Sequence, residues 1–161
     1  MLQVNFKMML VLCVAAAAIL LFFYWARRST TAPTANREVA MSISGRAYIL
    51  EVAETAESRA RGLSGRSKMG EDRGMLFIFD RAGVYPFWMK DTLIPLDIIW
   101  LKDGEIKDIV TLEAPTSTLF TPIHMPLVLA DAALELNAGE ANKLGLEVGD
   151  RLELPRRIID K

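Results

Sequence analysis

Five consecutive residues, Trp88 to Thr92, bring an indole, an ammonium, a carboxylate and a hydroxyl close together. An indole can stack on a ligand and an ammonium can bind an anion, so Trp88 and Lys90 are candidates for the wall of a small pocket. The alternative is structural, because Trp88 and Met89 are also residue types that fill a core while Lys90 extends into solvent.

Asp97 lies in a segment of alternating residues and shares its face with Ile99 and Leu101. That position draws its carboxylate toward the core, where an ionised group needs a partner. We expect a cation from the Arg61 or Lys90 region to hold Asp97. Such an ion pair could belong to a functional site, or it could serve only to fix the loop.

Glu135 stands between Leu134 and Leu136, so its side chain points away from theirs if the segment is a strand. If Glu135 converges with Asp97, the two carboxyl groups could perform acid–base catalysis or hold a cation. The alternative is a single exposed glutamate on the surface of a strand.

The segments that must position these side chains resemble strands. Residues 95–101 and 105–110 flank the pair Asp103-Gly104, which favours a two-residue hairpin turn. Asp97 therefore lies in the first strand of a predicted hairpin. Four further segments have the length and composition of strands: residues 46–53, 74–79, 87–89 and 151–154.

Two short helices are also expected. Thr55 can cap the first, over residues 56–61, and Gly62 can end it in a left-handed turn. Asn137 followed by Glu140 is a capping pattern for the second.

Residues 127–136 are ambiguous, because their composition favours a helix while Leu134 to Leu136 alternates as a strand does. Taken together, the pattern predicts about six short strands, two small helices and many turns, which is typical of a compact, mostly β domain.

Residues 8–25 form an uncharged run that ends in Tyr24 and Trp25. A helix of that length spans roughly 27 Å, close to the bilayer core of about 30 Å, and aromatic residues are typical of the membrane interface. We expect residues 1–28 to form an uncleaved transmembrane anchor, with a cleaved export signal as the alternative. A flexible linker is expected over residues 29–45, which begin with small, polar and proline residues.

Charge is unevenly distributed along the chain. Residues 1–37 carry +4, whereas residues 38–161 carry −5, from 15 basic and 20 acidic side chains. An acidic domain argues against nucleic acid as a partner, because phosphate binding needs a basic face. Basic residues flank the apolar run on both sides, and by a small margin they favour a cytoplasmic position for the C-terminal side.

Cys13 and His124 are the only residues of their types. Their number excludes an intrachain disulfide, a cysteine metal cluster and the multi-histidine zinc sites. We therefore expect no metal centre and no cofactor, although a carboxylate site for calcium or magnesium stays open.

Several short motifs occur in a fixed order along the domain. They are Arg61-Gly62-Leu63, Gly74-Met75-Leu76-Phe77, Phe87-Trp88-Met89-Lys90-Asp91-Thr92, Pro95-Leu96-Asp97-Ile98-Ile99, and Leu134-Glu135-Leu136-Asn137-Ala138-Gly139 with Gly149-Asp150. With these motifs, residues 46–154 resemble the prokaryotic family known as domain of unknown function 192.

The resemblance implies a single, mostly β domain of jelly-roll or barrel-like architecture, often behind an export signal, without an established biochemical function. The chain departs from the family pattern at Asp91, where asparagine is usual, and at Ser58, where an acidic residue is usual. The positions carried over as a shared candidate site are Arg61, Trp88, Lys90, Thr92, Asp97 and Glu135.

Because similar proteins are often exported, we expect the domain, residues 46–155, to lie outside the cytoplasm, in the periplasm or at the cell surface, followed by a short tail at 156–161. The first functional hypothesis is a membrane-tethered envelope module that binds a small polar or anionic ligand. The second is a hydrolase or lyase that uses Asp97 and Glu135, with a basic side chain stabilising an anion. The third is a structural or assembly factor without a ligand.

Overall fold

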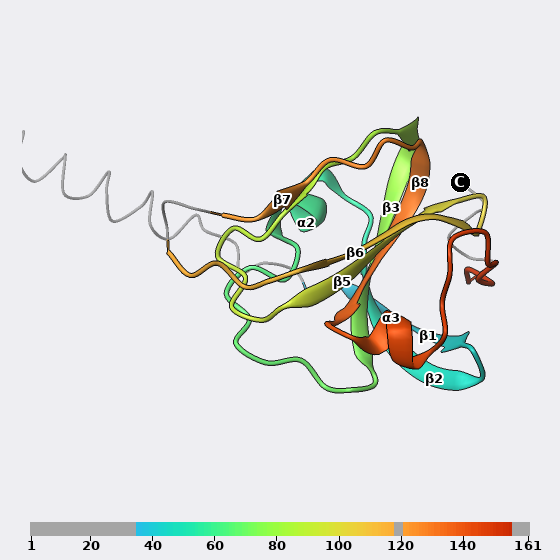
Figure 1. The fold of residues 1–161 in the computed structure, drawn as a ribbon, viewed down its shortest axis with the longest axis horizontal. Coiled ribbons are helices and arrows are strands. Elements are labelled where there is room, and N and C mark those ends of the chain that lie inside the picture. Colours follow the sequence, from blue (N-terminus) through green and yellow to red (C-terminus); the bar gives the residue numbers. More distant parts are fainter. Residues whose placement is uncertain (1–34, 118–120, 156–161) are drawn as a thin grey trace, which may run out of the picture. The chain divides into compact units, whose positions relative to one another are not determined.

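The computed structural model describes residues 35–117 and 121–155, which contain eight strands and two helices (Figure 1). Most of the six-stranded sheet is antiparallel, and one pair of strands is parallel. The predicted anchor, the tail at 156–161 and the first part of the predicted linker lie outside the described residues. No helix within the described ranges is long and apolar enough to cross a membrane.

The main sheet has its strands in an order that differs from their order in the chain. From one edge to the other these are β1 (Arg37–Ile43), β2 (Arg46–Ala53), β3 (Arg73–Gly83), β8 (Ala130–Asn137), β5 (Leu96–Lys102) and β6 (Glu105–Leu112). Two short strands, β4 (Phe87–Trp88) and β7 (Ile123–His124), form a second sheet. The helices are α2 (Ala56–Arg61) and α3 (Glu140–Lys143).

β2 and β3 form the parallel pair. A parallel connection needs a crossover, and here α2 and the loop that follows it return the chain to the start of β3. This crossover places α2 against one face of the sheet, where it becomes a wall of the candidate site.

The prediction of a mostly β domain with two short helices is confirmed, but the jelly-roll or barrel-like architecture is not. Among the described strands, β1 and β6 are the two ends of the sheet and do not pair with each other, so the sheet is open. A barrel requires those edges to meet, whereas this sheet is covered by separate elements on its two faces.

The sheet also begins earlier than the sequence analysis placed it. β1 occupies residues 37–43 of the predicted linker and pairs with β2 along its whole length. The alternation that marks a strand is present there, since Met41 and Ile43 are buried while Glu38 and Ser42 are exposed.

Each face of the sheet has its own apolar core. Tyr48, Leu50, Ile99 and Leu134 lie on the first face and are covered by α3 through Ala141. The second face carries Met75, Phe77, Ile98 and Trp100, covered by Leu63 after α2 and by Phe87 of β4. β8 contributes to both cores, so it is buried on both sides, and this explains why its sequence lacks a clean alternation. Residues 130–137 are therefore strand, so the ambiguous segment 127–136 is strand from residue 130 onward, and residues 127–129 belong to the preceding loop.

The predicted hairpin and first helix are confirmed. Asp103 and Gly104 have φ angles of 52° and 80°, as the mirror-image turn of a two-residue hairpin requires. The Thr55 side chain accepts from the Ser58 backbone N–H, and the Ser58 hydroxyl accepts from the Thr55 backbone N–H. Ser58 thus closes a capping box where the family pattern has an acidic residue.

The prediction that Asn137 caps the second helix is wrong. β8 continues through Asn137, and α3 begins after Gly139, whose φ of 83° turns the chain. The Asn137 Nδ2 instead donates to the Gly70 carbonyl at 2.9 Å. The predicted last strand, at 151–154, is reduced to a single bridge between Arg151 and Glu105.

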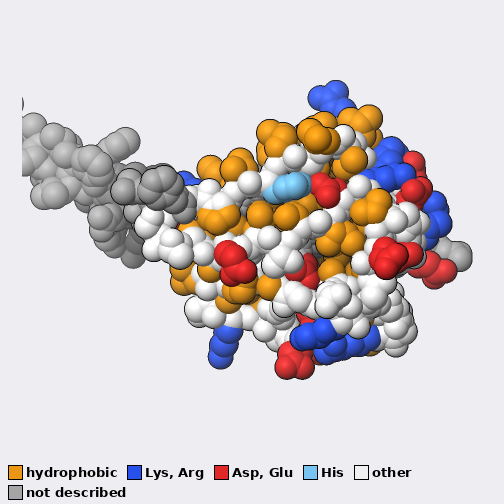
Figure 2. Space-filling view, in the orientation of Figure 1, with side chains coloured by type: hydrophobic (Ala, Val, Ile, Leu, Met, Phe, Trp, Pro, Cys, Tyr) orange, Lys and Arg blue, Asp and Glu red, His pale blue; other side chains and the backbone are white. Residues whose placement is uncertain are grey.

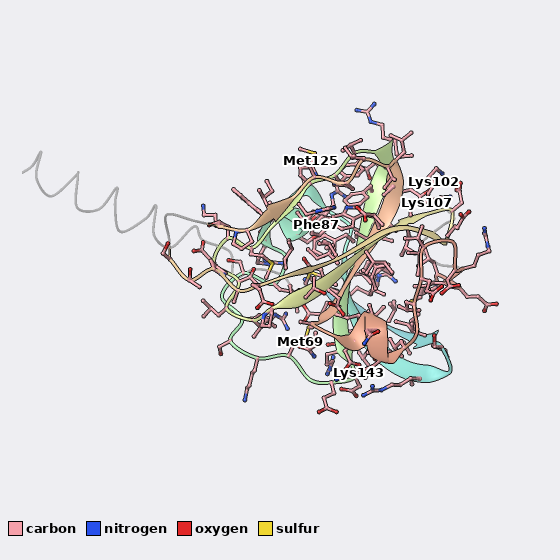
Figure 3. All side chains as sticks on the ribbon, viewed as in Figure 1. Met69, Phe87, Lys102, Lys107, Met125 and Lys143 are labelled. Carbon is pink, nitrogen blue, oxygen red and sulfur yellow. The ribbon has the colours of Figure 1, made fainter. Side chains whose placement is uncertain are left out.

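A buried carboxylate attaches α3 to the sheet. From β2, the Tyr48 hydroxyl donates to Glu140 at 2.8 Å and the Arg46 Nη1 donates to it at 3.0 Å. Within α3, Lys143, which is labelled in Figure 3, donates to Glu140 at 2.6 Å. The Lys143 and Tyr48 hydrogen bonds hold the pKa of Glu140 below its usual value, and burial together with Glu140 raises the pKa of Tyr48 to about 12. The short helix is therefore fixed by charge-assisted hydrogen bonds as well as by packing.

The small β4–β7 sheet packs on the second core through Phe87 and His124. The His124 ring lies 5.1 Å from the Trp100 ring, and its Nε2 is 2.8 Å from an oxygen of Asp108. Figure 2 shows the pale blue histidine among hydrophobic side chains. Since Ile123 is largely exposed, only one side of this small sheet is packed on the domain.

Candidate functional site

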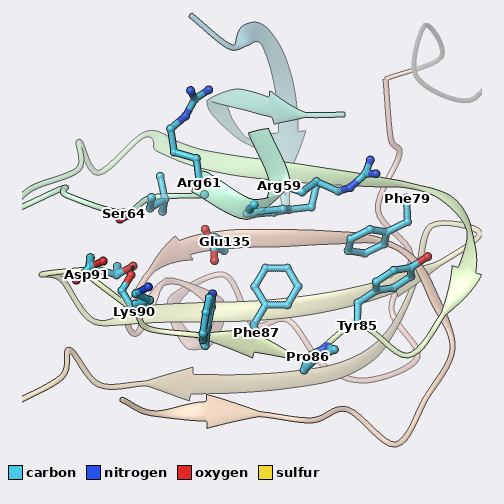
Figure 4. A pocket seen from close by; sticks show the side chains of 16 residues that line it. Arg59, Arg61, Ser64, Phe79, Tyr85, Pro86, Phe87, Lys90, Asp91 and Glu135 are labelled. Atoms are coloured by element: carbon cyan, nitrogen blue, oxygen red, sulfur yellow. Dashed lines mark hydrogen bonds between the residues drawn. The ribbon is translucent and has the colours of Figure 1, made fainter. Parts of the chain in front are cut away.

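A cleft of about 420 Å³ opens on the second face of the sheet. One wall is α2 with the loop after it, and the other is β4 with the loops on either side. Glu135 of β8 extends from the sheet between these walls (Figure 4). Five of the six predicted site residues line this cleft: Arg61, Trp88, Lys90, Thr92 and Glu135.

Backbone hydrogen bonds join the two walls at one end of the cleft. The Gly65 N–H donates to the Asp91 carbonyl at 2.7 Å, and the Leu93 N–H donates to the Arg66 carbonyl at 3.1 Å. Asp91 itself has a φ of 56°, a left-handed conformation that asparagine and aspartate adopt more easily than most residues. This backbone requirement accounts for the residue types that fit position 91.

Arg59 fastens the α2 wall to the sheet. Its Nη1 donates to the Glu54 and Ile78 carbonyls at 3.0 and 2.8 Å, and its Nη2 lies 3.4 Å from Asp80. The wall is therefore held by a charged group that caps backbone carbonyls. The sequence analysis missed Arg59, because its function depends on a carbonyl nineteen residues away.

Glu135 is the most unusual group in the cleft. Its residue is only 6% exposed, and its Oε2 is buried without a hydrogen-bond partner among the described residues. Burial raises the pKa of its carboxyl group to about 8, so the group is largely neutral at pH 7. The alternative of an exposed glutamate is wrong.

Gly74 of β3 allows the strand that carries Glu135 to approach closely. A Cβ atom at position 74 would lie 2.5 Å from the Glu135 carbonyl oxygen and 2.9 Å from Leu50 and Leu136 side-chain atoms. No side chain fits there, so glycine is required where β3 packs against Leu50 and Leu136 on the face opposite the cleft.

The Trp88 to Lys90 segment divides between core and cleft. Met89 is buried, as the structural alternative held, but Trp88 is 58% exposed. The Lys90 Nζ lies 5.4 Å from the centre of the Trp88 ring, a cation–π contact. In the described part of the chain, neither the Lys90 ammonium nor the Trp88 indole N–H forms a hydrogen bond or ion pair that would prevent contact with a ligand.

Arg61 and Thr92 line the cleft without offering a free group to it. The Arg61 guanidinium contacts Asn36 at 3.2 Å and Glu57 at 3.8 Å, and Figure 4 shows it directed away from Glu135. Thr92 is buried, and its hydroxyl lies 3.4 Å from the Lys90 carbonyl. Both residues therefore shape the walls.

Asp97 is not part of the cleft. It lies on the opposite face of the sheet, where it is 1% exposed and accepts from the Thr111 hydroxyl at 2.7 Å and from the Ala141 backbone N–H at 2.8 Å. The expected cation is absent, because no basic side chain in the described residues lies within 4.0 Å of this carboxylate. A free N–H in the first turn of α3 and a neighbouring hydroxyl take its place.

The two predicted catalytic carboxyl groups cannot act together. Asp97 pairs with Leu136 and Ile98 pairs with Glu135 in the β5–β8 register. Adjacent residues of a strand point to opposite faces, so the sheet itself separates Asp97 from Glu135. The hydrolase or lyase mechanism that needs both groups in one cleft is therefore overturned.

Several residues that the sequence analysis did not select complete the cleft. Ser64 and Asp91 line it at the end where the walls are joined (Figure 4). Toward the other end, the Phe79 and Tyr85 rings stack 3.7 Å apart with an angle of 10° between them. Phe79 is only 8% exposed and belongs to the second core, with Tyr85 packed against that core. Nothing in the sequence showed that these rings also border a cleft.

The described ranges contain no group of three or more histidine, cysteine, aspartate or glutamate side chains suited to a metal ion. The fold and the cleft thus define a class: an open mixed sheet with a cleft built around one buried, unpaired carboxyl group.

The chain belongs to the DUF192 family, described as an uncharacterized ACR, which matches residues 39–154. The solved structures similar to it include the following two. One, a protein from Sinorhizobium meliloti 1021 described as "a putative transcription regulator", has a TM-score of 0.65 and 34% identity, over 76% of this chain and 97% of that one. The other is a protein of unknown function from Novosphingobium aromaticivorans DSM 12444. It has a TM-score of 0.66 and 30% identity, and the match covers 78% of this chain and 91% of that one. A comparison with curated proteins finds no match.

Proposed function

We propose that the domain is a binding module that takes a small polar ligand into the cleft above Glu135. The observation that carries this proposal is the carboxyl group itself. A buried carboxyl group without a hydrogen-bond partner costs free energy, and Glu135, although only 6% exposed, lines the cleft. The site is therefore suited to a ligand that supplies a hydrogen-bond partner to this carboxyl group.

The cleft walls support the same reading. Trp88 offers an exposed ring on which an apolar part of a ligand can stack, and Lys90 offers a charge at the rim. If the cleft binds no small ligand, the third hypothesis, a structural or assembly factor without a ligand, is favoured instead.

We also propose that residues 8–25 anchor the protein in a membrane, with the domain on the outer side. The uncharged run and its terminal Tyr24 and Trp25 support an anchor. The Sinorhizobium meliloti protein is described as "a putative transcription regulator". For this chain, the net charge of −5 over residues 38–161 favours a small ligand over nucleic acid, because DNA binding needs a basic face.

The test is a ligand-detected NMR screen of the full chain against small amines, carboxylates, amides and sugars. Compounds that bind in the cleft are expected to lose binding in Trp88→Ala and in Glu135→Gln. They should bind equally well to Glu153→Gln, which removes an exposed carboxylate far along the chain. If no compound binds, or if both cleft variants bind as well as the natural chain, the proposal is wrong.

A further inference from the structure

Three basic side chains line the cleft, and each is engaged away from Glu135. Arg59 is engaged by two carbonyl groups and Asp80, and Arg61 by Asn36 and Glu57. The Lys90 ammonium lies over the Trp88 ring. The two remaining titratable groups are the Asp91 carboxylate at the mouth and the Tyr85 hydroxyl, which donates to the Arg81 carbonyl. The walls therefore hold three cations, yet none forms an ion pair with Glu135.

Aromatic side chains line the same cleft as Glu135. Phe77 and Phe87 meet edge to face with their centres 4.9 Å apart, and both line the same cleft. The stacked Phe79 and Tyr85 rings continue this wall (Figure 4). Aromatic faces carry negative partial charge, so they attract a cation and give no comparable stabilisation to an anion.

We infer that the cleft binds an organic cation, a protonated or methylated amine that carries an apolar group, with its positive charge against Glu135. This inference rests on the proposed function and names the chemical class of the ligand. The cationic group would pair with the buried carboxylate, and the apolar group would lie along the aromatic wall.

An anionic ligand fits these contacts less well. A ligand carboxylate or phosphate would have to approach Glu135 without a neighbouring guanidinium, since Arg61 is directed away from it. It could do so only while Glu135 keeps its proton. Lys90 could still reach an anion at the rim, so an anion is a specific alternative that the experiment must separate from the cation.

Binding of a cation changes the protonation of the protein in a defined way. The free carboxyl group holds a proton at pH 7, and an ammonium beside it favours the carboxylate, so one proton passes to solvent for each ligand bound. The affinity for a cation must then rise with pH until Glu135 is already ionised in the free protein.

The experiment titrates the full chain with three probes of similar shape: 2-phenylethylammonium, 2-phenylethanol and 3-phenylpropanoate. Calorimetry is carried out at several pH values between 6 and 9, where the ammonium stays charged. The pKa of Glu135 is followed in parallel from the 13C signal of its carboxyl carbon, with and without each probe. Glu135→Gln removes the charge at constant size, and Glu153→Gln is the matched control.

The expected result is that the ammonium binds about tenfold or more tightly than the other two probes at pH 8.5. Its affinity should rise by about tenfold per pH unit below the pKa of Glu135 and then level off. Glu135→Gln should bind the ammonium at least about tenfold more weakly than the natural chain, and Glu153→Gln should bind it with unchanged affinity. The 13C signal of the Glu135 carboxyl carbon should report a lower pKa in the complex than in the free protein. The carboxyl titration needs no variant, so it tests the inference even if Glu135→Gln fails to fold.

Two results overturn the inference but leave the proposed function standing. One is Glu135-dependent binding of 3-phenylpropanoate that weakens as pH rises, which would make the ligand an anion. The other is equal binding of the alcohol and the ammonium. If none of the three probes and no member of the NMR panel binds, both the inference and the proposed function are wrong.

Discussion

At the scale of single residues, Glu135 connects function with stability. Its carboxyl group is buried in the cleft without a hydrogen-bond partner, and the same burial opposes its ionisation. Ionisation of Glu135 above neutral pH therefore lowers the stability of the folded domain. Sites that bind ligands often hold such groups, because an interaction that the protein does not complete is one that a ligand can complete.

The stability of the protein should therefore depend on pH through Glu135. In the unfolded chain this carboxyl has its ordinary pKa of 4.5, and in the folded domain the pKa is about 8. Between these values the folded state binds a proton that the unfolded state has lost, so the contribution of Glu135 to stability falls as pH rises and is constant above about 8. Relative to Glu135→Gln, the natural chain should lose roughly 3–5 kcal/mol between pH 4 and pH 9.

Urea denaturation of the two proteins across that pH range measures the difference, and groups shared by both proteins cancel. Glu153→Gln should show no such trend, since its carboxylate is exposed. A stability difference that stays constant from pH 4 to pH 9 would mean that the Glu135 carboxyl group is not desolvated in the folded protein.

At the scale of secondary structure, Asp97 joins three elements on the face that has no cleft. It lies in β5, accepts from Thr111 of β6 and accepts from Ala141 in α3. A single buried carboxylate thus holds the short helix to the hairpin, and its role is architectural.

Replacing Asp97 tests that assignment. Asp97→Ala leaves the Thr111 hydroxyl and the Ala141 N–H without their acceptor, so we expect a loss of about 2–4 kcal/mol. Asp97→Asn should cost less, because the amide oxygen still accepts one hydrogen bond. Urea denaturation gives the free energy of unfolding of both variants, and probe binding in the cleft should be unchanged. Stabilities within about 0.5 kcal/mol of the natural chain would contradict the assignment.

Local chemistry was predictable from the sequence, whereas pairing between distant strands was not. The Asp103-Gly104 turn and the Thr55 cap depend on residues within a few positions, and both were predicted. The separation of Asp97 from Glu135 depends on the β5–β8 register, which joins residues about forty positions apart. Alternation showed that each side chain leaves its strand on a definite face, but it did not show that the two faces are opposite.

The same distinction applies to the candidate site. Five of the six predicted residues line the cleft, because the Trp88 to Thr92 segment and Glu135 stand out by residue type. Arg59 and the Phe79–Tyr85 stack were missed, since their roles follow from contacts made only after β3 and α2 pack together. The residue type alone indicates which side chains could react or bind, whereas the packing of the folded chain decides which of them lie in one site.

At the scale of the whole molecule, the compact unit that contains the sheet begins at Asn36. β1 covers the free edge of β2 and buries Met41 and Ile43. A fragment of residues 36–161 should unfold in one cooperative thermal transition, followed by circular dichroism. A fragment of residues 46–161 should lose at least about 3–6 kcal/mol from these two side chains alone, a large part of a typical domain's stability. Equal melting of the two fragments would show that β1 is dispensable.

The proposed location has an equally direct test. Protease added to intact cells from which any outer barrier has been removed should digest the domain while the membrane stays closed, and the residual anchor should remain in the membrane fraction. Digestion only after lysis would place the domain in the cytoplasm, as the basic residues flanking the apolar run favour. A soluble domain without the first residues would indicate that the segment is cleaved.

The central position of β8 has a consequence for how the chain reaches its fold. β8 is the last strand of the main sheet in sequence, yet it lies between β3 and β5. Until it is made, the chain can form only two half-sheets, β1-β2-β3 and β5-β6, each with one apolar strand edge left open. The main sheet is completed only when β8 pairs with both β3 and β5. These pairings join residues far apart in the sequence, so the fold has a high contact order and we expect it to form slowly. A chain that ends before residue 130 would keep both edges exposed, and such edges pair with other chains.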